Sequence, residues 1–322
     1  MAANERGRVP AAENGTIGAG AGERVPLAVD EIEPELAGYI EQFRPVFLRK
    51  DVVRQATRYV VALMSELPRK NGQTMADRIE GIHNRQAVHQ LLRISPWSAE
   101  QLDQQRVQHA LRVASTGRDA ALIIDETSVL KQGSRSVGTK RQYLGCVGKT
   151  ANGQVAVTLH YQDDRYDWPV TGRLYLPQDW ATDAALRQET DVPDEVQFLT
   201  KPQIALDLLR RVRTWDLPPA TVIADPGYCD LNVLSELDDQ NVPFCLGAAA
   251  DFRVRLPGKQ GALCRVDELA ARMPDDQWQS VIYREGTKQS LVKEFVAVRV
   301  QAATAQAKEP AMIKCPRLTS GK

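Results

Sequence analysis

Nothing in this chain of 322 residues points to disulfides, a zinc site or a membrane span. The five cysteines are scattered and odd in number, and no two of them form a CxxC pair. No apolar run approaches the roughly eighteen residues of a membrane span, and the N-terminus lacks the apolar core of a signal peptide. These absences predict a soluble protein of a reducing, cytoplasmic environment with no membrane partner.

The chain also lacks a net charge, because 41 Lys and Arg residues balance 41 Asp and Glu residues. The overall charge therefore does not indicate a nucleic-acid partner. The local balance differs: between Glu41 and Arg118 there are 13 basic residues and 7 acidic residues, a surplus of 6. This surplus fits contacts with phosphates, and a solvated helical face accounts for it about as well.

The first third of the chain predicts a leader followed by helices. Residues 1–28 are rich in Ala, Gly, Glu and Arg without periodicity, which predicts a disordered leader. In residues 29–117, apolar positions recur at helical spacing from Phe43 to Leu63, and shorter helices follow, the last one capped by Ser98. Short helices with basic residues between them are typical of a helix-turn-helix DNA-binding module, and a plain helical bundle is the alternative.

Residues 118–300 read instead as a mixture of strands and helices. Apolar runs predict strands at 120–125, 141–148, 153–162, 170–176, 220–224 and 242–247, with helices at 202–215 and 230–239. This order predicts an α/β fold with an RNase H-like mixed sheet. Further strand-like runs at 280–284 and 294–300 predict a β-rich insertion at about 250–300, and residues 301–322 are expected to form an irregular tail.

Two of the predicted strands end in aspartate. Leu122-Ile123-Ile124 precedes Asp125, and Val222-Ile223-Ala224 precedes Asp225. The first and fourth strands of an RNase H-like sheet lie side by side, so the two carboxylates should converge there. Metal-dependent phosphodiester chemistry needs such convergence, because it uses two divalent cations about 3.5–4 Å apart. The alternative, a purely structural role, is that each aspartate only forms a turn or caps a helix.

Several motifs in ordered succession carry a family resemblance. They are Ile124-Asp125-Glu126-Thr127, Lys131-Gln132-Gly133, Arg141-Gln142-Tyr143, Thr200-Lys201-Pro202, Ala224-Asp225 with Gly227-Tyr228, and Arg284-Glu285-Gly286-Thr287-Lys288. Over residues 40–300 the chain thereby resembles the DDE-type transposases of bacterial insertion sequences.

The resemblance implies a DNA transposase that cleaves the DNA strands of an insertion sequence and transfers them. It implies that Asp125 and Asp225 are catalytic and that both bind Mg²⁺, for which Mn²⁺ substitutes. The implied partner is double-stranded DNA, both element ends and target, along a path lined by four basic residues: Lys131, Arg135, Lys140 and Arg141. It further implies a bacterial cytoplasmic protein, associated with the nucleoid when bound to DNA, and is compatible with a homo-oligomer on DNA.

The third carboxylate is the departure from the family pattern. In the resembled family it is a glutamate on a helix beyond the β-rich insertion, and no such helix is predicted here. Glu285 lies in what reads as a strand or its turn, and Glu126 should face away from Asp125 if the strand alternates. We therefore expect a transposase truncated at the C-terminus that binds DNA but is a poor nuclease. A non-catalytic DNA-binding remnant is the alternative, whereas a haloacid-dehalogenase-type enzyme would need an aspartate where Thr127 stands.

Overall fold

The computed structural model describes residues 34–67, 69–79, 81–113, 119–256, 263–285, 290–302 and 311–316. The predicted leader, residues 1–28, lies outside the described residues. The chain divides into two compact units, Met1–Gln105 and Arg106–Lys322, which are described separately below. No helix in the described ranges combines the length and apolarity needed to cross a membrane.

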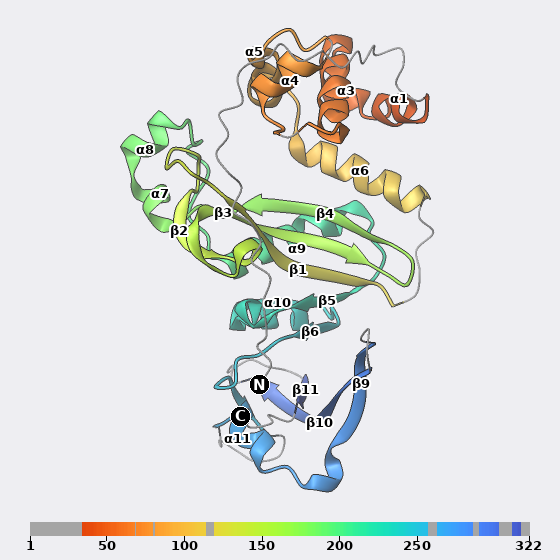
Figure 1. The fold of residues 1–322 in the computed structure, drawn as a ribbon. Coiled ribbons are helices and arrows are strands. Elements are labelled where there is room, and N and C mark those ends of the chain that lie inside the picture. Colours follow the sequence, from red (N-terminus) through yellow and green to blue (C-terminus); the bar gives the residue numbers. More distant parts are fainter. Residues whose placement is uncertain are drawn as a thin grey trace, which may run out of the picture. The chain divides into compact units, whose positions relative to one another are not determined.

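The first unit is helical (Figure 1). Its long helix α3 buries Val52, Val53 and Ala56, which share one face at helical spacing. The two short helices that follow are each capped by an asparagine: Asn71 accepts from the Thr74 N–H at 2.9 Å, and Asn84 accepts from the Ala87 N–H at 3.0 Å. The elements are α1 (Pro34–Glu41), α2 (Arg44–Phe47), α3 (Lys50–Met64), α4 (Gly72–Arg78), α5 (Arg85–His89) and the π-helical turn η2 (Gln90–Ile94).

Helix α6 (Ala99–Val113) spans the boundary between the units. It begins at the predicted cap, where the Ser98 hydroxyl accepts from the Gln101 N–H at 3.2 Å. Its second half packs on the following sheet: the Arg106 guanidinium donates to the carbonyls of Pro169 and Val170 at 2.5 and 2.6 Å, and Val107 is fully buried. These contacts place the boundary earlier than the residue 117 expected from sequence.

The second unit contains an RNase H-like mixed sheet (Figure 1). Strand β1 lies at its centre, antiparallel to β3 and parallel to β5, and the order is β2-β3-β1-β5-β6, with β4 also paired to β3. This arrangement confirms the predicted fold class. The strands are β1 (Ala121–Leu130), β2 (Lys140–Leu144), β3 (Lys149–Gln162), β4 (Asp167–Leu174), β5 (Thr221–Ala224) and β6 (Phe244–Leu246).

The two faces of this sheet differ in burial. Leu122 and Ile124 of β1 belong to the apolar core, together with residues of α9 (Lys201–Val212) and α10 (Leu231–Asp239). We call this side the covered face. The alternate residues of β1 and β5 point to the opposite side, where Ile223 retains 37% of its exposure and Asp125 is exposed. We call that side the open face.

A polar stretch for which no element was predicted contains two short helices, α7 (Gln178–Thr182) and α8 (Ala184–Glu189). Trp180 of α7 is buried and donates from Nε1 to the Thr139 carbonyl at 2.8 Å. Asp183 caps α8 by accepting from the Leu186 N–H at 2.9 Å. The sequence pattern missed these helices because they are short and depend on tertiary contacts.

A second sheet, in the order β11-β10-β7-β8 with β9 also paired to β10, occupies the expected β-rich region. Val254, Val296 and Val300 form the buried centre of its apolar cluster. The expectation of an irregular tail was wrong for residues 311–316, because this segment forms an antiparallel ladder with the preceding strand β10, from Val300 opposite Ala311 to Phe295 opposite Pro316. The elements are β7 (Arg253–Arg255), β8 (Leu263–Arg265), α11 (Val266–Ala271), β9 (Gln279–Glu285), β10 (Ser290–Ala302) and β11 (Ala311–Pro316).

Candidate active site

The register of β1 and β5 brings the two predicted aspartates together. Ile124 pairs with Ala224 in this parallel ladder, so Asp125 and Asp225 each follow the last paired position. Adjacent strands lie about 4.8 Å apart, and both side chains are exposed. β5 ends where predicted, but β1 continues to Leu130 because its second half pairs with β3. Asp125 is therefore held within a strand, and Asp225 at the end of one.

Each aspartate is tied to backbone through one carboxylate oxygen. Oδ1 of Asp125 accepts from the Glu126 N–H at 2.7 Å, and Oδ1 of Asp225 accepts from the Gly227 N–H at 2.9 Å. Among the described residues, neither Oδ2 accepts a hydrogen bond. Both carboxylates are thus oriented by the chain and still have an oxygen to offer a ligand.

Two glycines, Gly227 and Gly247, leave room for the tight turn that follows Asp225. This turn is the 3₁₀ segment η5 (Pro226–Tyr228). A Cβ on Gly227 would lie 3.1 Å from Oδ1 of Asp225, and a Cβ on Gly247 would lie 2.7 Å from the Pro226 ring. Gly247 also donates its N–H to the Ala224 carbonyl at 2.8 Å. β6 can therefore approach the end of β5 only with a glycine at position 247.

Glu126, the neighbour of Asp125, faces the covered side as alternation requires. Its carboxylate binds Nζ of Lys201, at the start of α9, at 2.6 Å. The Lys201 ammonium also lies 5.7 Å from the centre of the Tyr175 ring. Lys201 is placed there because Thr200 and Gln203 form a capping box that fixes the first turn of α9.

Tyr228 ends the turn that follows Asp225, and its side chain is 1% exposed. Burial, then the negative charges of Glu126, Asp225 and Asp125, raise the pKa of Tyr228. The hydroxyl makes no well-formed hydrogen bond with any described residue, although the Glu126 carboxylate is within its reach. The phenol therefore lies where all three carboxylates act on it.

The aspartate pair suits a divalent cation. Carboxylate oxygens are the ligands that Mg²⁺ and Mn²⁺ prefer, and Mg²⁺ is often held by one or two carboxylates together with water and substrate phosphate. Asp125 and Asp225 would hold such an ion through their free oxygens. In the described part of the chain, no third His, Cys, Asp or Glu joins them in a group of metal-binding geometry. The Glu285 side chain lies outside the described ones.

The four predicted DNA-binding residues fall into two groups. Two are paired with acids: Lys140 Nζ lies 2.8 Å from Asp179, and Arg135 forms an ion pair with Glu189. Arg141 is exposed, and its guanidinium forms no ion pair with a described residue. Because Arg141 is opposite Asn152 on β3, and Asp125 is opposite Thr158, Arg141 shares the open face with Asp125. Lys131 follows β1 directly.

Sequence reasoning missed the roles of Lys201 and Tyr228. The motifs Thr200-Lys201-Pro202 and Gly227-Tyr228 carried the family resemblance, but they do not show that both side chains reach the strand ends. The Lys201–Glu126 pair joins residues 75 apart in sequence. Strand alternation, which puts Glu126 on the covered face, was the available signal for it.

A mixed sheet in which two aspartates directly follow the last paired positions of its central parallel strands is the arrangement of an RNase H-like domain. Comparison with known proteins gives the particular family: the chain matches the model of the DDE superfamily endonucleases over residues 42–290, and it belongs to that family. Endonucleases of this family depend on divalent metal ions and act on DNA.

Two individual proteins are similar to the chain. The probable transposase for insertion sequence element IS701 of Microchaete diplosiphon is 33% identical over 209 residues, which are 64% of this chain and 52% of the relative. The chain thus spans about half the length of that curated relative. A solved piggyBac transposase in a synaptic complex with hairpin DNA is 11% identical, with a TM-score of 0.34, over 87% of this chain and 55% of the other.

Proposed function

We propose that the chain carries the catalytic aspartates of a DNA transposase of an insertion sequence. The observation that supports this most directly is the parallel register of β1 and β5, in which Asp125 and Asp225 each directly follow the last paired position. The relationship to a probable insertion-sequence transposase supports the reaction class. In this proposal both aspartates are ligands of Mg²⁺, with Mn²⁺ as a substitute.

The residues of the chain have separate tasks in this reaction. Asp125 and Asp225 would hold the cation, each with one carboxylate oxygen that accepts no hydrogen bond from a described residue. A divalent ion bound there supplies Lewis-acid stabilisation of the charge that develops on the reacting phosphate oxygens. The backbone N–H groups of Glu126 and Gly227 keep the two carboxylates oriented while DNA enters.

The basic residues near β2 are proposed to hold duplex DNA. Arg141 is on the same face as Asp125, but its β3 partner Asn152 is six residues from Thr158, the partner of Asp125, which is about 20 Å along the strand. It is therefore proposed to bind a phosphate further along the duplex. Lys140 and Arg135 must exchange an acidic partner for a phosphate, so each should contribute less. Lys131 lies at the end of β1 and completes the set.

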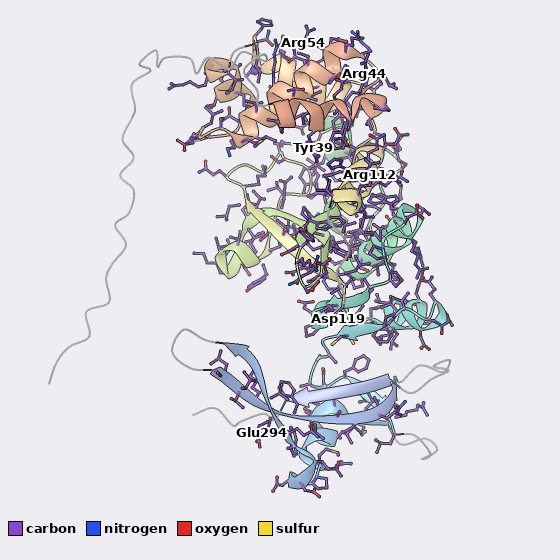
Figure 2. All side chains as sticks on the ribbon, turned by 90° about the vertical axis from the view of Figure 1, so that its right-hand side faces the viewer. Tyr39, Arg44, Arg54, Arg112, Asp119 and Glu294 are labelled. Atoms are coloured by element: carbon purple, nitrogen blue, oxygen red, sulfur yellow. The ribbon has the colours of Figure 1, made fainter. Side chains whose placement is uncertain are left out.

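The helical unit offers a second surface for duplex DNA. We propose that α4 and α5 act as a helix-turn-helix module. Helix α5 with η2 exposes Arg85, Gln86, His89 and Gln90. Arg and Gln side chains are those that hydrogen-bond to base edges in the major groove. Arg54 of α3, labelled in Figure 2, adds an exposed positive charge to this unit.

A second candidate function is a non-catalytic DNA-binding protein of the same family. The observation favouring it is that, among the described residues, no third metal-binding side chain joins Asp125 and Asp225 in a group that could hold a metal ion. Two carboxylates suffice to hold one cation, whereas DNA cleavage in this class of site uses two. For the same reason, we expect the nuclease activity of this chain to be weak.

The test is a nicking and strand-transfer assay with Mg²⁺ or Mn²⁺ on DNA that carries the ends of the element. We expect weak, metal-dependent nicking that Asp125→Asn and Asp225→Asn each abolish. Asp194→Asn, an isosteric change at an exposed aspartate on a loop, should leave it unchanged. Nicking that survives Asp125→Asn would refute the proposal, and DNA binding without any nicking would establish the non-catalytic alternative.

A further inference from the structure

Three side chains outside the aspartate pair converge behind it, from three separate motifs. Glu126 comes from β1, Lys201 from the start of α9, and Tyr228 from the turn after β5. Glu126 and Lys201 are each about one-third exposed, whereas Tyr228 is almost fully buried. The functional assignment of Asp125 and Asp225 leaves all three without a role.

As a purely structural residue, Tyr228 would lower the stability of the fold. A buried hydroxyl without a hydrogen-bond partner destabilises a fold, and phenylalanine would fill the same space without that cost. The contrast with Tyr161 is informative: that side chain is equally buried, but its hydroxyl donates to Asp163 at 3.1 Å. The acceptor within reach of this buried donor is the Glu126 carboxylate.

The connections of Tyr228 indicate what it could control. Its N–H donates to the Asp225 carbonyl at 3.2 Å, so the ring and Asp225 belong to one tight turn. Its hydroxyl lies near Glu126, whose N–H in turn binds the Asp125 carboxylate. Tyr228 thus shares a turn with Asp225 and lies near Glu126, the neighbour of Asp125, while Lys201 neutralises Glu126.

We propose that Glu126, Lys201 and Tyr228 form a positioning cluster, in which the Tyr228 hydroxyl and the Glu126–Lys201 ion pair fix the relative orientation of Asp125 and Asp225 for a divalent cation. This inference rests on the proposed function of the two aspartates. Glu126 is a positioning residue in it and not a third ligand, because its carboxylate is bound to Lys201 on the covered face. Removing a group that orients a metal ligand typically lowers metal affinity roughly 10–100-fold, and we expect a loss of that order here.

The experiment measures binding of Mn²⁺ alone to the full chain, by calorimetry, together with the thermal midpoint Tm of each variant. Tyr228→Phe should lower the Mn²⁺ affinity about 10-fold or more. It should leave the Tm unchanged or raise it, because it removes an unsatisfied buried hydroxyl. The matched control Tyr161→Phe should do the reverse: it loses a formed hydrogen bond, so the Tm falls while the Mn²⁺ affinity stays the same.

Glu126→Gln separates positioning from direct ligation. It keeps the shape of the side chain and should lower the Mn²⁺ affinity about 10-fold, less than Asp125→Asn does. A loss as complete as that of Asp125→Asn would make Glu126 a ligand and overturn its assignment here. An unchanged affinity in Tyr228→Phe, with Asp125→Asn impaired, would refute the positioning cluster alone. Normal Mn²⁺ binding by Asp125→Asn would refute the proposed function as well.

Discussion

The two faces of the central sheet, built from the same strands, serve different purposes. On the covered face Leu122 and Ile124 pack with α9 and α10, and Glu126 ends the series in an ion pair with Lys201. On the open face the alternating positions lead from Ile123 to the exposed Asp125. One strand thus places a core residue and the proposed metal-binding aspartate at consecutive positions, because successive side chains of a strand point to opposite sides.

The largest effect should come from truncating the covered face. Ile124, which is 2% exposed, packs in the main core, whereas Ile223 on the open face is 37% exposed. Ile124→Ala should lower the free energy of unfolding by about 2–5 kcal/mol. Ile223→Ala should cost roughly 1 kcal/mol or less. Equilibrium urea unfolding of both variants measures the difference, and equal losses would contradict the assignment of the two faces.

The next largest loss of stability is expected from a change in the turn that follows Asp225. In Gly247→Ala the new methyl group would meet the Pro226 ring at 2.7 Å, so the turn must shift. We expect the free energy of unfolding to fall by about 1–3 kcal/mol, together with a loss of Mn²⁺ affinity. Gly133→Ala is the control, because a Cβ there has no atom within 4 Å. Unchanged Mn²⁺ binding in Gly247→Ala would show that the turn does not set the position of Asp225.

DNA affinity should distinguish two neighbouring residues of β2 that point to opposite faces. Arg141→Ala removes a charge on the open face and should weaken duplex binding several-fold, lowering the slope of log affinity against log salt by about 1. Lys140→Ala should have a smaller effect because Lys140 is already paired with Asp179. Filter binding at several salt concentrations measures both slopes, and a larger effect of Lys140→Ala would reverse the assignment.

The smallest effect should be the pH dependence of an ion pair between the covering helices. A hydrogen bond from Arg210 lowers the pKa of Glu236, so the pair stabilises the fold above the ordinary glutamate pKa and loses this contribution as the pH falls through the lowered value. Because Arg210 is 57% exposed, we expect less than about 1 kcal/mol. The stability difference between wild type and Glu236→Gln should be present near neutral pH and disappear as the pH falls through the lowered pKa of Glu236. A difference that persists in acid would exclude this ion pair as its cause.

What the sequence reveals depends on whether the signal is local. The apolar runs before Asp125 and Asp225 predict buried parallel strands, and together with the RNase H-like order they predict that the two carboxylates meet. Helix α9 follows from its periodicity and its cap at Thr200. These features need only neighbouring residues and a known sheet order.

The missed features depend on contacts between distant residues. β11 exists through pairing with β10, and α7 is held by Trp180 donating to the Thr139 carbonyl, 41 residues away. The cluster behind the aspartates needs the turn after β5, the start of α9 and β1 to meet in three dimensions. Periodicity carries no information about contacts between these elements, so the sequence identifies Lys201 and Tyr228 only as motif residues.

The central claim is that Asp125 and Asp225 hold one and the same cation. The most direct test is a double-mutant cycle on the Mn²⁺ affinity of the full chain, with Asp125→Asn, Asp225→Asn and the double variant. If the aspartates share an ion, each single substitution removes most of the affinity and the second adds little to the loss. Losses that simply add, or a single variant that binds Mn²⁺ like the wild type, would contradict the shared site.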